Sequence, residues 1–212
     1  MGWRGLLIEP ILPLCQKAAA ARPRSRVIHA ALSRPGREGS ARFTITQNVP
    51  VLSFLDADAD HVARCHREGA VPVQVDVPVT TLNHVLRSER RRPAAFGSPW
   101  VPKNGWRIDL VSIDVEGGEL DVLAGFDLAR FRPRVLLIEN DRPSGAVLEG
   151  YLAERGYRKF HRQVINDFYA LADGSTDDLQ LSGLVPVSRT APSVGLSAEA
   201  ALSQDGKSTS PR

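Results

Sequence analysis

Residues 108–139 read IDLVSIDVEGGELDVLAGFDLARFRPRVLLIE, and this stretch decides the fold class. It predicts a buried strand over 108–115, a glycine turn at 117–118, a helix over 119–126 and a second buried strand over 134–139. Two short apolar strands joined by a helix are typical of a βαβ unit, whose strands are parallel and buried on both faces. The stretch therefore favours a three-layer α/β domain.

The rest of the chain repeats this alternation. Further strands are expected over 5–9, 26–31, 43–46, 71–82, 157–162 and 164–171, and helices over 12–21, 56–68, 144–155 and from Thr80 or Thr81 to Leu86. Internal prolines place the 71–82 strand at a sheet edge, and the Arg-, Pro- and Gly-containing stretch 87–107 is expected to form a loop. We expect a domain over residues 1–173 and a largely disordered tail over 174–212, because the tail has few large apolar residues.

Composition indicates an ordinary globular protein. The 212 residues are 42% hydrophobic and 24% charged, which excludes collagen-like, coiled-coil and wholly disordered chains. The net charge of +3 comes from dispersed basic residues and does not indicate nucleic-acid binding. Cys15 and Cys65 stand far apart, so neither a zinc site nor a disulfide framework is predicted. With no leader pattern and no apolar run of about 20 residues, we expect a cytoplasmic protein without membrane contact.

Acidic residues follow several predicted strands. Glu9 closes the first, Asp114 and Glu116 follow the 108–115 strand, and Glu139 with Asn140 and Asp141 ends the next. Ligands of open parallel sheets bind at the carboxyl ends of the strands, and an acid there can accept hydrogen bonds from ribose hydroxyls. The alternative for Glu9 is that it is simply the first polar residue after a buried run. For Asp114 and Glu119, the alternative is a capped helix start, which we favour for Glu119.

Five segments of the chain resemble one protein family. They are GWRGLLIEP (2–10), PVTTLNHVL (78–86), IDLVSIDVEGGELDVLAGFDLARFRPRVLLIEN (108–140), YLAERGY (151–157) and NDFYAL (166–171). In this order they are similar to the FkbM-type S-adenosylmethionine-dependent methyltransferases, from residue 2 to about 171. The resemblance implies a class I methyltransferase fold with a doubly wound, mostly parallel sheet. It also implies methyl transfer to a hydroxyl of a sugar or natural product, a small-molecule or glycan acceptor.

The resemblance assigns roles to four acids. Glu9 matches the acid that holds the cofactor ribose. Asp114 and Glu116 match the acidic motif beside the transferred methyl group, so both are expected to be catalytic, and Asp114 also to bind the cofactor. Glu139 matches the acid after the fifth strand of the family.

One part of the family pattern has no counterpart in the chain. The glycine-rich turn after the first strand lies roughly 20 residues before the ribose acid in such folds, but only eight residues precede Glu9. The first strand, the first helix and the glycine-rich loop are therefore expected to be missing. Either the flanking strands pair directly, or another chain supplies a strand, or the natural protein is longer, which we favour. The alternative function is a cofactor-free remnant or interaction module completed by a partner strand.

The proposed chemistry requires activation of a hydroxyl. A sugar hydroxyl is a poor nucleophile at neutral pH and needs a base or a metal ion. Asp114, Glu139 and Asn140 follow neighbouring strands, which predicts oxygen ligands about 5–8 Å apart that suit Mg²⁺. Either Mg²⁺ binds there or Asp114 acts as the general base. The acceptor pocket is expected from residues 34–70 and 87–107, His61 is expected on a helix surface, and a homo-oligomer is an open expectation.

Overall fold

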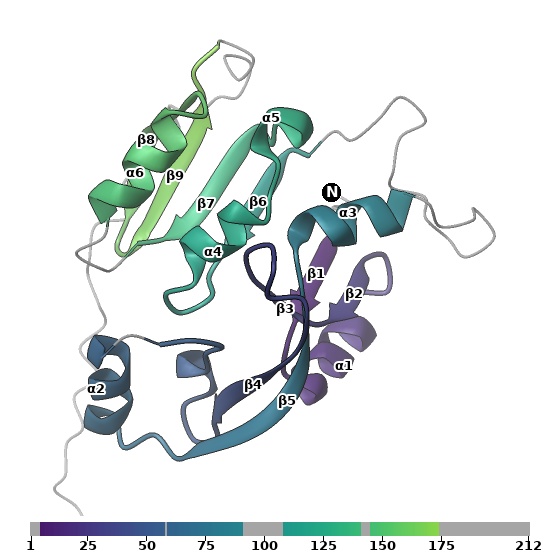
Figure 1. Ribbon diagram of the computed structural model, residues 1–212, viewed down its shortest axis with the longest axis vertical. Helices are drawn as coiled ribbons and strands as arrows, with labels where there is room; N and C mark the ends of the chain where they lie inside the picture. The colour runs from purple at the N-terminus through teal and green to yellow at the C-terminus, as the bar shows by residue number, and fades with distance from the viewer. Residues whose placement is uncertain (1–4, 58, 91–107, 141–144, 174–212) are drawn as a thin grey trace, which may run out of the picture. The chain divides into compact units, whose positions relative to one another are not determined.

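The computed structural model describes residues 5–57, 59–90, 108–140 and 145–173, and these form a mixed α/β structure (Figure 1). Its first sheet pairs β1 (Leu6–Glu9) with β2 (Arg26–His29) in parallel, and helix α1 (Leu12–Ala21) connects them. A proline in the first turn of α1 is favourable, because the backbone nitrogen there needs no partner within the helix. The predicted strand over 5–9 and helix over 12–21 are confirmed.

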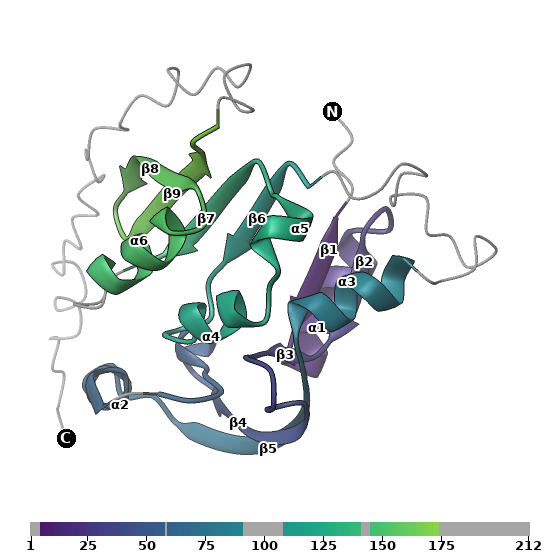
Figure 2. The same cartoon turned by 45° about the horizontal axis from the view of Figure 1, so that its top comes forward.

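The second sheet has the order β3-β5-β4, from β3 (Ala31–Leu32), β5 (Pro72–Thr80) and β4 (Gly39–Thr46). Strands β4 and β5 form a long, curved antiparallel ladder (Figure 2). Strand β3 pairs only with Val79 and Thr80 of β5. The predicted edge position of the 71–82 strand is wrong, because β5 lies between β3 and β4. Both prolines of β5 lie where β4 is its one partner in this sheet, which explains how a central strand tolerates them.

Two helices follow β4, and one follows β5. The 3-10 helix η1 (Pro50–Leu52) and helix α2 (Ala59–Arg67) come before β5, and helix α3 (Leu82–Arg90) comes after it. The predicted cap of α3 is confirmed, because Thr81 Oγ1 accepts a hydrogen bond from the backbone N–H of His84 at 3.1 Å. The loop predicted over 87–107 is wrong for residues 87–90, which extend α3, and residues 91–107 lie outside the described part.

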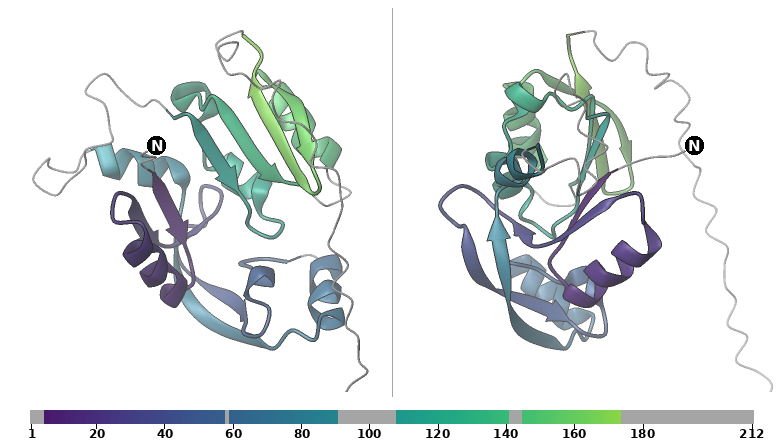
Figure 3. Two further views of the ribbon diagram at one scale, coloured as in Figure 1. Left: turned by 180° about the vertical axis from the view of Figure 1, so that it is seen from behind. Right: turned by 90° about the vertical axis from the view of Figure 1, so that its right-hand side faces the viewer.

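The third sheet has the order β6-β7-β9-β8. Its strands are β6 (Leu110–Ile113), β7 (Val135–Glu139), β8 (Tyr157–Gln163) and β9 (Asn166–Leu171). Strands β6 and β7 are parallel, whereas β9 is antiparallel to both β7 and β8. Helices α4 (Glu119–Ala124), α5 (Leu128–Phe131) and α6 (Gly145–Ala153) gather on one face of this sheet (Figure 3, right).

The main hydrophobic core lies between this sheet and its helices. Leu136 and Ile138 of β7 are completely buried, as are Leu123 of α4 and Leu152 of α6. Each such side chain stabilises the fold by about 1.5–3 kcal/mol through burial of apolar surface. A smaller cluster joins Ile11 to the apolar residues of β4 and β5. The VLLIE strand buries Leu136 and Ile138 completely on one face, whereas Val135 and Leu137 on the other face are half-buried, so the predicted burial on both faces is confirmed only in part.

The predicted α/β composition is confirmed, but a single doubly wound, mostly parallel sheet is not. In the described residues β1 pairs with β2 alone and β6 with β7 alone, so β1 and β6 do not close up against each other. The 71–82 strand and the two C-terminal strands run antiparallel to neighbours, which makes two of the sheets mixed. The predicted tail, 174–212, lies outside the described residues. Every described helix is too short or too polar to span a lipid bilayer.

Candidate functional site

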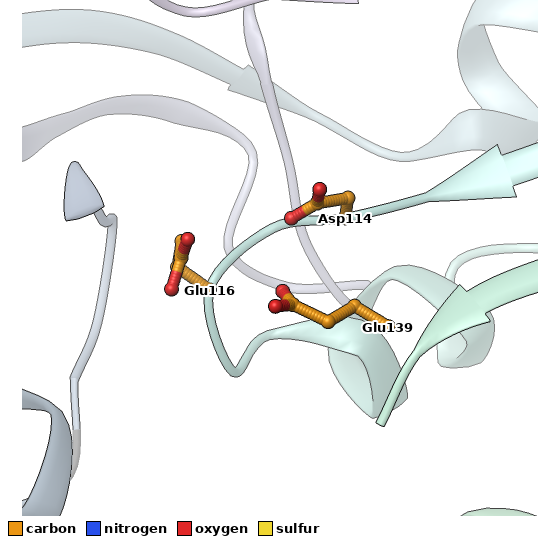
Figure 4. Close-up of side chains that lie close together, drawn as sticks. All are labelled: Asp114, Glu116 and Glu139. Atoms are coloured by element: carbon orange, nitrogen blue, oxygen red, sulfur yellow. The ribbon is translucent and has the colours of Figure 1, made fainter. Parts of the chain in front are cut away.

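Three carboxylates converge where β6 and β7 end. Asp114 directly follows β6, Glu139 is the last residue of β7, and Glu116 lies in the turn after Asp114 (Figure 4). One oxygen from each lies within 4.8 Å of the others. The parallel register, with Ile113 opposite Ile138, brings these two strand ends to the same edge of the sheet. The sequence-based expectation that Asp114 and Glu139 lie close together agrees with this arrangement.

The turn that carries Glu116 is backbone-strained. Glu116 has a φ of 54°, a left-handed conformation that is costly for a side chain larger than glycine, and Gly117 follows with a φ of 106°. Glu119 stabilises this turn, because its Oε1 accepts hydrogen bonds from the N–H groups of Val115 at 3.3 Å and Gly117 at 3.0 Å. Glu119 therefore has the structural role that the helix-start interpretation favours. Strained residues persist where the surroundings determine them and often mark functional sites.

Helix α2 contacts the acidic turn through two cationic or titratable side chains. Arg64 Nη1 lies 3.6 Å from Glu116 Oε2, and His61 Nδ1 lies 3.5 Å from the same oxygen. His61 is buried, and its Nε2 lies 3.0 Å from the carbonyl oxygen of Leu52. The prediction that His61 is a surface residue is wrong, because its ring is buried beside Leu52 and Glu116. Neither of these neighbours belongs to α2, so the sequence of the helix does not reveal them. Sequence reasoning also missed Arg64, and only the His-x-x-Arg spacing on one helical face hints at a shared target.

Asn140, a predicted metal ligand, belongs to a buried polar network. Its Nδ2 donates a hydrogen bond to Asp167 Oδ2 at 2.6 Å, and Asp167 also accepts bonds from Arg162 and from the hydroxyl of Tyr169. Burial and then the negative charge of Asp167 raise the pKa of Tyr169, so this hydroxyl stays protonated and can donate. The side-chain oxygen of Asn140 is its one metal-binding atom. Its role as a ligand stays a prediction.

Glu9 lies at the carboxyl end of β1. Its Oε1 accepts a hydrogen bond from the backbone N–H of Ile11 at 2.8 Å, and the ring of His29 bonds to the adjacent Pro10 carbonyl. Burial raises the pKa of Glu9, while the Ile11 hydrogen bond and the charge of His29 lower it to a smaller degree. A half-buried acid at a strand end has the chemistry required to accept hydrogen bonds from hydroxyl groups.

A large cavity connects Glu9 with the acidic turn. Its volume is about 1970 Å³, and it is lined along their full lengths by β1 and β6, with Glu9, Asp114 and Glu116 among the lining residues. Apolar side chains such as Leu82, Leu86 and Phe126 form much of its wall. Small-molecule pockets usually occupy about 300–1,000 Å³, so this space exceeds what one cofactor needs.

Ser33 also lines this cavity, and its side chain is buried without a hydrogen-bond partner in the described residues. A buried hydroxyl without a partner costs about 1–3 kcal/mol. It therefore marks a place that a polar ligand or another backbone group would satisfy.

Comparison of the sequence with models of known protein families identifies the family of this chain. The family model described as methyltransferase FkbM domain matches residues 1–159, about three quarters of the chain. The chain belongs to the FkbM methyltransferase family. Searches of curated proteins and of solved structures return no match to it. For an FkbM methyltransferase domain, the acids at the ends of β1, β6 and β7 become the natural candidates for the functional site.

A cationic ligand fits this donor set. Three carboxylates within 4.8 Å repel one another, so a positive charge placed among them is favoured. Oxygen ligands on opposite sides of Mg²⁺ lie about 4.2 Å apart, given metal–oxygen distances of about 2.1 Å. Small side-chain rotations would therefore bring Asp114, Glu116 and Glu139 to coordinating distances. The sulfonium of S-adenosylmethionine is a second cation that these carboxylates suit.

Proposed function

We propose that this FkbM methyltransferase domain uses S-adenosylmethionine to methylate a hydroxyl group of a sugar or natural product. The observation that carries the proposal is the convergence of Asp114, Glu116 and Glu139, of which Asp114 and Glu116 line the same cavity as Glu9. Glu9, which lines the same cavity, would accept hydrogen bonds from the cofactor ribose. When bound, the cofactor supplies an electrophilic methyl group on a positively charged sulfur.

The residues of the acidic turn would activate the acceptor. Transfer of the cofactor's methyl group to an acceptor hydroxyl would require a group of the protein to take the hydroxyl proton. Asp114 is exposed and can take this proton as general base. Alternatively, Asp114 and Glu139, with Asn140, would hold a Mg²⁺ that acidifies the hydroxyl. Methyl transfer that survives thorough chelation would refute the metal alternative and leave the general base.

Calorimetric titration with S-adenosylmethionine tests the cofactor assignment. We expect the chain to bind it, and Glu9→Gln and Asp114→Asn each to weaken binding about tenfold, equivalent to about 1.4 kcal/mol. Asp76→Asn is a matched control, because Asp76 is an exposed β5 acid that forms a surface ion pair with Arg42. Its affinity should stay within about twofold. A chain that binds no cofactor, or variants that all bind equally, would contradict the proposal.

A second function is favoured by the free edges of β1 and β6. Neither strand has a second strand partner in the described residues, and both line the same cavity. Gly5 and Glu9 accept bonds from the β2 side, and alternate residues of a parallel strand bond to opposite neighbours. Leu6 and Ile8 therefore direct their backbone groups toward the open side. Directly before β6, Asp109 accepts a hydrogen bond from Val135 on the β7 side. By the same alternation, Leu110 and Ser112 direct their backbone groups away from β7, toward the open side.

The alternative is thus an interaction module whose sheet a partner strand completes. A strand buried between β1 and β6 would need an apolar run on both faces. A probe peptide containing Val-Ile-Val-Leu-Val between lysines should slow amide hydrogen exchange at Ile8 and Ser112, whereas the same peptide with a central proline should not. Equal exchange with both peptides would refute this function. Clear binding of S-adenosylmethionine by the chain alone would refute the cofactor-free version of it.

A further inference from the structure

Glu116 lies between acidic neighbours on one side and a basic side chain of α2 on the other. One oxygen of its carboxylate belongs to the acidic cluster with Asp114 and Glu139. Its Oε2 faces Arg64 and His61 of α2, and the side chain is only 12% exposed. A nearly buried carboxylate beside two others is unfavourable unless a positive charge compensates it. The described structure provides that charge from α2.

The α2 residues are themselves held in place. The ring of His61 is fixed by the Leu52 carbonyl at 3.0 Å and by an edge-on contact with Phe54, with ring centroids 5.0 Å apart. Because a carbonyl oxygen can only accept, Nε2 donates to Leu52, and Nδ1 is the atom directed at Glu116. Arg64 follows one turn later on the same helical face, so its guanidinium reaches the same oxygen.

This contact is consistent with the strained backbone of Glu116. A left-handed conformation is unfavourable for a residue with a side chain, and Glu116 retains it next to Gly117. The attraction of Arg64 offsets part of that cost by holding the carboxylate on the α2 side of the turn. The position of Glu116 therefore depends on α2 as well as on its own loop.

We propose that Arg64 is a positioning residue that serves as an internal counter-charge of Glu116, with His61 Nδ1 lying beside the same carboxylate oxygen. A cationic ligand of the acidic cluster then competes with α2 for this carboxylate. This inference rests on the proposed function, since it assumes that the site binds a cation. Helix α2 would thereby set the preference of the site for charged S-adenosylmethionine over the neutral product S-adenosylhomocysteine. These two molecules differ by one methyl group and one positive charge.

The ratio of the two affinities, measured by calorimetry, tests the competition. Arg64→Gln removes a positive charge near the cluster, so we expect it to raise the affinity for S-adenosylmethionine relative to S-adenosylhomocysteine about three- to tenfold. Arg64→Lys should leave the ratio unchanged. Arg67→Gln is the matched control, because Arg67 is an exposed arginine in the last turn of α2, and it should change the ratio less than about twofold.

Titration with Mn²⁺, followed by electron paramagnetic resonance, shows whether a divalent cation is the competing ligand. A gain in Mn²⁺ affinity in Arg64→Gln, with an unchanged ratio for the two sulfur compounds, assigns the competition to a metal. A gain in the sulfur-compound ratio alone assigns it to the sulfonium. A folded Arg64→Gln protein with no gain in either would overturn the competition, because a merely structural role predicts equal or weaker binding.

A thermal double-mutant cycle tests the positioning without any ligand. Arg64→Gln should lower the unfolding midpoint by removing a positive charge beside Glu116, and adding Glu116→Gln should recover most of that loss. Additive midpoints would overturn the positioning role. Absence of binding by the unsubstituted chain to all three probes would refute the proposed function and the competition, while the cycle would still decide whether α2 positions Glu116.

Discussion

Glu9 combines a structural cost with a proposed binding role. Burial raises its pKa from an ordinary value near 4.5, because the carboxylate loses hydration when β1 packs against the main core. A folded-state pKa above the unfolded one means that the folded state holds the proton more tightly. The resulting contribution to stability is present at low pH and is lost as the pH rises through the folded pKa.

Glu9→Gln should therefore make the protein more stable at pH 7, while it weakens cofactor binding. The amide keeps an oxygen that can accept the Ile11 hydrogen bond but carries no charge to desolvate. Unfolding midpoints from pH 4 to 8 provide the measurement, and the difference from the unsubstituted protein should grow as the pH rises above about 4.5. A less stable variant at pH 7 would show that the charge of Glu9 is stabilising.

Individual elements were largely predictable where local chemistry determines them. The strand ends at Glu9 and Glu139 follow from apolar runs closed by an acid, and the start of α3 follows from the cap at Thr81. The burial of His61 was not predictable, because it depends on the remote residues Leu52 and Glu116. Likewise, Asn140 gave no sign of its bond to Asp167, which requires the β7–β9 pairing.

Alanine substitution of two helix glycines should change the free energy of unfolding in opposite directions. A Cβ at Gly125, which ends α4, would lie 2.6 Å from the backbone oxygen of Ser33 and 3.2 Å from Thr81 Cβ. Gly125→Ala should therefore lower the free energy of unfolding by about 1–3 kcal/mol. At Gly150, inside α6, a Cβ meets nothing within 4 Å. Gly150→Ala should raise the free energy of unfolding by about 0.5–1 kcal/mol.

Urea denaturation of both variants measures these changes. Equal effects of the two substitutions would mean that the end of α4 can move away from Ser33 and Thr81 at no cost in free energy. That result would contradict the tight contact at Gly125.

At the scale of the molecule, the division into several sheets could not be predicted from local patterns. Sequence periodicity identifies strands, but the neighbour of each strand depends on contacts between remote segments, such as β3 with β5. The family resemblance predicted where the acids lie and an uncovered edge beside β1. It did not predict the long β4–β5 ladder, whose eight paired positions run from Gly39 opposite Val79 to Thr46 opposite Pro72.

The β1–β2 pair should be the least stable part of the sheet structure. A two-stranded sheet is marginal by itself, and β1 has no strand on its other side in the described residues. Amide hydrogen exchange should therefore be faster in Leu7 and Ile28 than in Leu136 and Tyr169, which lie in the buried third sheet. Equal protection at all four amides would indicate that the whole domain opens as one cooperative unit.

The two edges of the third sheet differ in their resistance to aggregation. Strand β8 carries Arg158, Lys159 and Arg162 and an irregularity between Lys159 and His161, features that discourage pairing with another molecule. Strand β6, LVSI, has no charge and leaves Leu110 44% exposed. In concentrated solution, we therefore expect strands of other molecules to add first at β6. Purification conditions that keep this edge covered should keep the protein monodisperse.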